Sequence, residues 1–270
     1  MNTGKILFLG AGNIAEAIIS GLVSSDGSLK SRIIASDIRG ERLKYLSKKY
    51  GIAGARGNLD KIASCSIIVL AVKPQQMPEM LAGLSGRITK KHLVVSVAAG
   101  ISTGFIEKHL GTRSLPVIRT MPNTPVFVRE GMVALCAGKH AKKSHLKTAA
   151  GLFNCAGKTL VLPERYFDAV TAVSGSGPAY LFYFAQGMME AAGKMGLPEA
   201  VSRELAVQTL FGAAKMLRSC GEKPEILRQR VTSPGGTTEQ AIKYFESRKF
   251  RNIVIDAIEC ARKRSKELTK

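Results

Sequence analysis

A short glycine-containing turn near the start of the chain could hold a diphosphate. Gly10-Ala11-Gly12-Asn13-Ile14-Ala15 lies between the apolar run 5–9 and a segment from Glu16 whose apolar positions recur at helical spacing. Gly10 permits a tight turn, and Gly12 has no Cβ, so backbone N–H groups can approach a pyrophosphate. The following helix would point its free N–H groups and positive dipole end at the phosphates. The motif therefore predicts a dinucleotide site, with an ordinary strand-to-helix turn as the alternative.

The next apolar run, 32–36, ends at Asp37, which follows Gly12 by 25 residues. This is near the position where an acidic side chain accepts hydrogen bonds from the adenosine ribose of NAD. Arg39 lies close behind and could instead pair with a 2′-phosphate. The two residues favour different cofactors, so both NAD and NADP stay open at this point. Asp37 as a plain turn residue is the structural alternative.

A second loop with binding chemistry is Ser233-Pro234-Gly235-Gly236-Thr237-Thr238. We expect its adjacent glycines to expose backbone N–H groups and Thr237 to cap a helix, with Gln240 completing a capping box. Such a helix start favours a small carboxylate, and the Thr238 hydroxyl can donate or accept a hydrogen bond. A plain helix cap is the alternative. The segment 174–178 is similar, because it could hold an anion or only interrupt a helix.

Residues for strong acid, base or metal chemistry are poorly arranged in this sequence. The histidines lie in or beside basic segments, where we expect solvated side chains: His92, His109, His140 and His145. The cysteines are scattered without metal-type spacing and are expected to be small buried hydrophobes in a reducing cytosol: Cys65, Cys136, Cys155, Cys220 and Cys260. We therefore expect no metal. Hydride transfer to an already electrophilic carbon needs mainly placement and a hydrogen bond at the adjacent heteroatom.

The elements that must position these loops divide the chain in two. Apolar runs at 66–72, 93–97, 115–119, 132–136 and 159–162 predict strands of a sheet covered on both faces. After Pro163 the pattern predicts helices alone, at 166–173, 179–195, 199–218, 225–230, 239–247 and 250–267. The predicted fold class is α/β: an N-terminal Rossmann domain (1–162) with a doubly wound, mainly parallel sheet, followed by an all-helical domain (163–270).

The bulk properties bear on partners and location. The apolar character of the helix 179–195 predicts that it buries a face against a second subunit. No apolar stretch is long enough to span a bilayer, and the start runs directly into the first strand, so we expect neither a membrane segment nor a signal peptide. The net charge of +20 lies mostly in residues 1–162. Because the basic residues are dispersed without aromatic platforms, we interpret them as surface charge rather than as a nucleic-acid site.

Six motifs in sequence order resemble those of the pyrroline-5-carboxylate reductase family, and the likeness covers essentially the whole chain. The motifs are Leu9-Gly10-Ala11-Gly12-Asn13-Ile14-Ala15, Ala71-Val72-Lys73-Pro74, Ala98-Ala99-Gly100, Arg119-Thr120-Met121-Pro122-Asn123-Thr124-Pro125, Ser174-Gly175-Ser176-Gly177-Pro178-Ala179-Tyr180 and Val231-Thr232-Ser233-Pro234-Gly235-Gly236-Thr237-Thr238. The last of these is the most family-specific.

The resemblance implies reduction of 1-pyrroline-5-carboxylate to L-proline, with NADP as cofactor and NAD as the alternative, in a cytoplasmic homodimer that can assemble into decamers. It implies cofactor contacts by Leu9, Gly10, Ala11, Gly12, Asn13, Ile14, Ser36, Asp37, Asn58, Ala71, Val72, Lys73, Pro74, Ala98, Ala99 and Gly100. It implies substrate contacts by Ser176, Ser233, Gly236, Thr237 and Thr238, the last of which is the catalytic residue, hydrogen-bonded to the ring nitrogen. A reductase of a related small imine or acid and a non-catalytic regulatory relative are the alternatives.

Overall fold

The computed structural model describes residues 4–57 and 59–269 and contains two compact units. Unit 1 comprises Met1–Ser176 together with Ala261–Lys270, and unit 2 comprises Gly177–Cys260. The predicted domain boundary after residue 162 stays a prediction.

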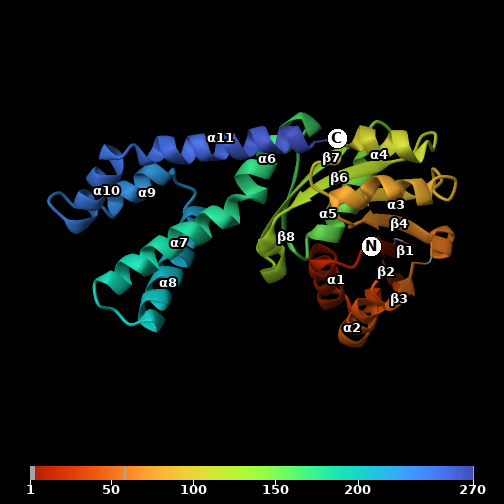
Figure 1. Cartoon of the computed structure of the whole chain (residues 1–270), viewed down its shortest axis with the longest axis horizontal. Coiled ribbons are helices and arrows are strands. Elements are labelled where there is room, and N and C mark those ends of the chain that lie inside the picture. Colours follow the sequence, from red (N-terminus) through yellow and green to blue (C-terminus); the bar gives the residue numbers. More distant parts are fainter. Residues whose placement is uncertain (1–3, 58, 270) are drawn as a thin grey trace. The chain divides into compact units, whose positions relative to one another are not determined.

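Unit 1 is built on an eight-stranded sheet with the order β3-β2-β1-β4-β5-β6-β7-β8 (Figure 1). The strands are β1 (Lys5–Leu9), β2 (Ile33–Asp37), β3 (Ala53–Arg56), β4 (Cys65–Leu70), β5 (Leu93–Ser96), β6 (Val117–Pro122), β7 (Gly131–Ala137) and β8 (Gly157–Val161). All neighbours are parallel except β6 and β7, which are antiparallel. The predicted doubly wound, mainly parallel sheet is therefore confirmed.

Helices cover both faces of this sheet. Successive residues of a strand point to opposite faces, and the central strands are apolar at nearly every position, so both faces must be buried. Ile6 and Phe8 of β1 belong to one core, which they share with α1 (Asn13–Ser25), α2 (Gly40–Tyr50) and α5 (Lys143–Phe153). Leu7 and Leu9 belong to the opposite core, with α3 (Met77–Leu84) and α4 (Thr103–Leu110) (Figure 1). This arrangement holds the carboxyl ends of β1, β2, β4 and β5 rigidly side by side.

Two expectations about reactive side chains are corrected, one in each unit. His92 is not solvated: it is 5% exposed, and its ring nitrogens lie 2.9 Å from the Thr89 amide nitrogen and 3.2 Å from the Ile62 carbonyl oxygen. The prediction that all cysteines are buried is wrong for Cys220 and Cys260, which are exposed on this chain. Cys65 and Cys136 are buried as expected, and burial raises the pKa of the Cys136 thiol to about 12.

Unit 2 is helical. Its elements are α7 (Gly177–Lys194), α8 (Glu199–Ser219), α9 (Pro224–Arg230), α10 (Thr237–Ser247) and the first part of α11 (Phe250–Leu268), whose end belongs to unit 1. The α7 and α8 helices pack together, and Phe250 contacts Phe184 and Phe245 with ring centroids 6.4 and 5.1 Å away. The first segment of unit 1 ends with α6 (Phe167–Val170) and a π-helical turn (Thr171–Gly175).

A carboxylate near the start of the first helix ties α1 to α2. Glu16 pairs with Arg42 and also accepts hydrogen bonds from α2 side chains, namely Tyr45, Lys49 and Tyr50 at 3.1, 3.1 and 2.8 Å. Burial acts to raise the pKa of the Glu16 carboxyl, but these hydrogen bonds outweigh it and lower the pKa from 4.5 to about 2. A lowered native pKa contributes stability above the unfolded pKa that is lost as the pH falls through the native one.

We expect Glu16→Gln to lower the free energy of unfolding at pH 7 by about 1–3 kcal/mol, because the α2 cations lose a buried partner. The deficit shrinks as the pH falls from 4.5 towards 2, where the wild-type carboxyl also becomes protonated. Urea unfolding across that pH range measures it, with the exposed Glu79→Gln on α3 as the control. A pH-independent deficit would contradict the linkage.

Candidate functional site

Loops from four neighbouring strands converge at one edge of the sheet. The Gly10 amide donates to the Ser36 carbonyl at the end of β2 over 2.8 Å, and the Ala71 amide after β4 donates to the Leu9 carbonyl over 2.7 Å. The Val97 amide after β5 donates in turn to the Leu70 carbonyl over 3.0 Å. The strand order reverses direction between β1 and β4, and ligands of such folds bind in the crevice at this point.

The two glycines of the first turn have different surroundings. Gly10 has a φ of +95°, and a Cβ built on it would lie 2.6 Å from the Ala71 carbonyl oxygen and 2.8 Å from the Val72 nitrogen. Its lack of a side chain is therefore required by the fold itself. Gly12 is the N-cap of α1, has no side-chain cap, and has nothing within 4 Å of a built Cβ. This open helix start fits a diphosphate held by backbone amides.

Asp37 lies beside this turn, at the end of β2. Its carboxylate accepts the Ala11 amide over 2.9 Å and the Arg39 guanidinium over 2.9 and 3.0 Å. Although burial opposes the shift, the hydrogen bonds from Arg39 and Ala11 lower the pKa of Asp37 to about 2. The group is therefore a permanent anion near neutral pH and is fixed against the glycine turn.

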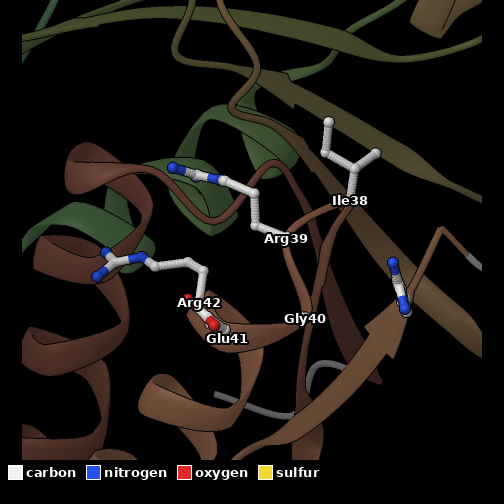
Figure 2. Close-up of a pocket in the computed structure, with 6 residues that line it drawn as sticks. Ile38, Arg39, Gly40, Glu41 and Arg42 are labelled. Atoms are coloured by element: carbon white, nitrogen blue, oxygen red, sulfur yellow. The ribbon is translucent and has the colours of Figure 1, made fainter.

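A cationic pocket of about 490 Å³ opens next to Asp37, and its lining is Ile38, Arg39, Gly40, Glu41, Arg42 and Arg56. Figure 2 shows the Arg39 and Arg42 side chains directed to the same side, away from Ile38. Arg42 is already engaged, because its Nε donates to the Ala11 carbonyl over 2.7 Å and its guanidinium pairs with Glu16. The Arg39 side chain is 61% exposed and can turn towards a ligand. Guanidinium groups in this pocket suit a phosphate.

The loop after β5 lines the other end of the crevice. Ser96 supports it, since its Oγ accepts the Ala98 amide over 3.3 Å and its carbonyl accepts the Thr120 hydroxyl over 2.9 Å. Gly100 has a φ of +69° and is buried, whereas Ala99 is exposed. The small side chains leave room for a flat ring against the backbone.

In unit 2, the glycine loop leads into α10 differently from what the sequence predicts. Gly236, not Thr237, is the N-cap, and it makes no side-chain cap hydrogen bond, so the expected capping box is wrong. The loop is instead closed by the Gly235 amide, which donates to the Glu239 carboxylate over 3.0 Å. That hydrogen bond, with a further contribution from Lys243, lowers the pKa of Glu239.

The expectation that both glycine amides are exposed donors is also wrong, because the Gly236 amide donates to the Ser233 carbonyl over 3.0 Å. The helix start itself leaves its first amides without intrahelical acceptors, and these belong to Thr237 and Thr238. The half-buried Thr238 thus offers a hydroxyl beside amides that can receive a carboxylate.

The structure gathers most of the predicted cofactor residues at one edge of unit 1. Leu9–Ile14 end and follow β1, Ser36 and Asp37 end β2, and Ala71–Pro74 and Ala98–Gly100 follow β4 and β5. Asn58 lies outside the described residues. Of the predicted substrate residues, Ser233, Gly236, Thr237 and Thr238 lie in unit 2, and Ser176 is the last residue of the first segment of unit 1.

Sequence reasoning missed several residues that build the site. Arg42 and Arg56 line the cationic pocket but lie outside any motif. Asn123 fastens the π-helical turn: its Nδ2 donates to the Ser174 carbonyl over 3.2 Å, while its Oδ1 accepts the Met132 amide over 2.8 Å. The presence of Asn123 and Ser174 in two separate family-like motifs was the available signal for this contact.

Within the residues that the structure describes, no cluster of three or more His, Cys, Asp or Glu side chains could hold a metal ion. A search of the same residues finds no helix with the length and apolar character needed to cross a membrane.

Comparison with known proteins gives matches over both parts of the chain. Residues 164–268 match the family profile described as pyrroline-5-carboxylate reductase dimerisation. Residues 5–100 match the profile described as NADP oxidoreductase, coenzyme F420-dependent. The pyrroline-5-carboxylate reductase of Pseudomonas aeruginosa is 40% identical over 269 residues, covering 99% of this chain and 98% of that protein.

Solved structures are similar along the full length as well. The pyrroline-5-carboxylate reductase of Coxiella burnetii has a TM-score of 0.91 and 37% identity, with complete coverage of both chains. The pyrroline carboxylate reductase of Plasmodium falciparum, solved with NADP bound, has a TM-score of 0.88 and 27% identity, again with complete coverage of both chains. On the full-length match at 40% identity and the family profile over the helical part, the chain belongs to the pyrroline-5-carboxylate reductase family.

Proposed function

We propose that this chain reduces 1-pyrroline-5-carboxylate to L-proline, the last step of proline synthesis, with NADPH as hydride donor. The observation that carries the proposal is the full-length membership of the family together with an open glycine turn at the switch point of the sheet. The substrate has an electrophilic C=N carbon, so catalysis needs placement and a hydrogen bond to the ring nitrogen.

The chain's own residues would divide the work as follows. The turn Gly10–Ile14 receives the diphosphate, with the amides of Gly12–Ile14 as donors because those of Gly10 and Ala11 already donate to Ser36 and Asp37. Ser36 and Asp37 lie by the adenosine ribose, and Ala71–Pro74 and Ala98–Gly100 line the rest of the cofactor, with Asn58 beside it. NADPH, when bound, supplies the hydride.

The residues of unit 2 would hold the substrate. Ser233, Gly236 and Thr237 receive its carboxylate, and the occupied Gly236 amide favours the amides of Thr237 and Thr238 as the donors. Thr238 keeps a hydroxyl hydrogen bond at the ring nitrogen while the adjacent carbon is reduced. Ser176, which belongs to unit 1, completes the proposed substrate set.

A direct assay tests the proposal against its closest rival. Purified protein is incubated with NADPH and either pyrroline-5-carboxylate or its six-membered imine analogue, and cofactor oxidation is followed by absorbance. We expect a clearly higher kcat/KM for the five-membered substrate. Preference for the six-membered ring would indicate a reductase of a related imine, and no turnover with bound NADPH would indicate a non-catalytic relative.

The preference for NADP over NAD is proposed on the cationic pocket. Asp37 at the end of β2 favours NAD, but Arg39 pairs with it and neutralises its charge, so that Arg56 adds positive charge where a 2′-phosphate would lie. We expect Arg39→Ala with Arg56→Ala to raise the KM for NADPH about tenfold or more and to leave the KM for NADH within about twofold.

Steady-state kinetics with each cofactor measures this effect. The control is Lys44→Ala, which removes a positive charge on the exposed side of α2, outside the pocket. Equal changes for NADPH and NADH would assign the arginines to general electrostatic attraction rather than to the 2′-phosphate.

The assembly and location are proposed in the same way. The chain carries the dimerisation region of its family, and unit 2 leaves large apolar side chains exposed, including Leu181, Phe182, Tyr183 and Phe211. We propose that unit 2 forms a homodimer, which can assemble into a decamer, and that the domains are 1–162 for the cofactor and 163–270 for dimerisation and substrate. We also propose a cytoplasmic protein without nucleic-acid or membrane partners. Sedimentation at micromolar concentration that shows only monomers would overturn the dimer.

A further inference from the structure

We propose that the C-terminal turn of the chain, Ser265–Thr269, is a positioning element for the loop Ala98–Gly100, and that Asp168 fastens it there. The proposal rests on the proposed function, because it concerns the loop assigned to the nicotinamide side of the cofactor. All of the residues that carry it belong to unit 1.

The fastening point is a single carboxylate oxygen. Asp168 Oδ1 on α6 lies 2.8 Å from Ser265 Oγ and 3.1 Å from Thr269 Oγ1, so both hydroxyls can donate to it. Ser265 is buried, and Thr269 Oγ1 also lies 3.0 Å from the Ser265 carbonyl oxygen. A hydroxyl in the last turn of α11 and another one residue after the helix, four residues apart, therefore meet one acceptor from an element 97 residues earlier than Ser265 in the chain.

The fastened turn lies directly on the cofactor loop. A Cβ built on Gly100 would be 2.9 Å from the Leu268 carbonyl oxygen and 3.8 Å from the Thr269 Cα. Gly100 is buried at this point and has a φ of +69°, so both its backbone conformation and its neighbours require glycine. The C-terminal backbone thus forms one wall of the space in which the loop can move. Figure 1 shows this end of the chain beside α4, which follows the loop.

The other end of the same loop is already rigid. Glu164 accepts the Thr103 amide and hydroxyl at the start of α4 over 2.8 and 2.6 Å, and it pairs with Arg119 over 3.0 Å. Arg119 is only 2% exposed and stacks on the Phe167 ring, next to Asp168 in sequence. Since Glu164 fixes the exit of the loop and Ser96 its entry, the C-terminal turn controls the remaining freedom of its centre.

The experiment compares Ser265→Ala/Thr269→Val with wild type, Asp168→Asn and Thr148→Val. The double variant removes both hydroxyl donors, whereas Asp168→Asn keeps an acceptor oxygen at the same place. Thr148→Val removes a similar hydroxyl-to-carbonyl hydrogen bond on α5, away from the loop. We measure NADPH affinity by fluorescence without substrate, the KM for each substrate, and amide hydrogen exchange of residues 97–102.

We expect the double variant to weaken NADPH binding about fivefold or more and to speed exchange in 97–102, with the KM for pyrroline-5-carboxylate within about twofold of wild type. Asp168→Asn and Thr148→Val should stay within about twofold for NADPH. The proposal would be overturned if the double variant left NADPH affinity and the hydrogen exchange of residues 97–102 unchanged. It would also be overturned if binding of NADPH and of pyrroline-5-carboxylate weakened equally while exchange rose throughout unit 1. If the wild-type protein does not bind NADPH, the proposed function is overturned instead. Hydrogen exchange of residues 97–102 would still test whether the C-terminal turn positions the loop.

Discussion

Gly12→Ala is expected to abolish most NADPH binding while leaving the fold intact. Nothing lies within 4 Å of a Cβ at this position, and Gly12 has a φ of −70°, which any residue adopts. A methyl group there costs the free protein little, but it stands where backbone amides must approach the diphosphate. We expect the KM for NADPH to rise about 30-fold or more, with the thermal midpoint within about 2 °C of wild type.

Gly10→Ala, two residues earlier, serves as the comparison, because it is expected to destabilise the fold itself. Its Cβ would overlap the Ala71 carbonyl, and its φ of +95° is strained for alanine, so the protein itself should lose about 2–4 kcal/mol of stability. Calorimetry and NADPH titration of the two variants separate the effects. Normal NADPH binding by Gly12→Ala would contradict the proposal that the diphosphate binds at this turn.

Thr238→Ala is expected to lower kcat about 100-fold and to change the affinity for NADPH by less than about twofold. The hydroxyl is the group proposed to hydrogen-bond the ring nitrogen, a contact that matters most as that nitrogen gains electron density during reduction. Thr238 lies at the second residue of α10 in a helix that needs no side-chain cap from it, so the substitution should not unfold the helix.

Thr238→Ser is the control, because it retains the hydroxyl and should recover most of the activity. Thr232→Val removes a nearby hydroxyl that only donates to the Arg228 carbonyl over 2.7 Å, and it should leave kcat nearly unchanged. Pre-steady-state kinetics with NADPH reports the hydride step directly. A wild-type kcat for Thr238→Ala would show that Thr238 has no catalytic role.

The sequence was sufficient for the parts of the fold that depend on local pattern. The apolar run ending at Leu9, the glycine turn and the helix after it need only neighbouring residues, and the strands ending at Leu70 and Ser96 have almost no polar position. The short strand β3 was not predicted, because Ala53-Gly54-Ala55-Arg56 has no β-branched or aromatic residue and pairs only with β2.

The errors come from interactions between distant residues or from competing partners. His92 follows two lysines, which indicates a surface, yet its ring turns inward to the Ile62 carbonyl, 30 residues away. Thr237 fits a capping box, but the N-cap is Gly236, and the Glu239 carboxylate accepts the amide of Gly235 before it. The Asp168–Ser265 contact spans 97 residues, and no periodicity in the sequence predicts such a pair.

The position of β1 has a consequence for synthesis of the protein on the ribosome. This strand is synthesised before both of its neighbours in the finished sheet, β2 and β4, and β4 ends only at Leu70. At about 5–20 residues per second, the backbone N–H and C=O groups of β1 that pair with β4 stay unpaired for roughly 3–12 s. A translational pause before Leu70 would prolong the exposure of these unpaired backbone groups.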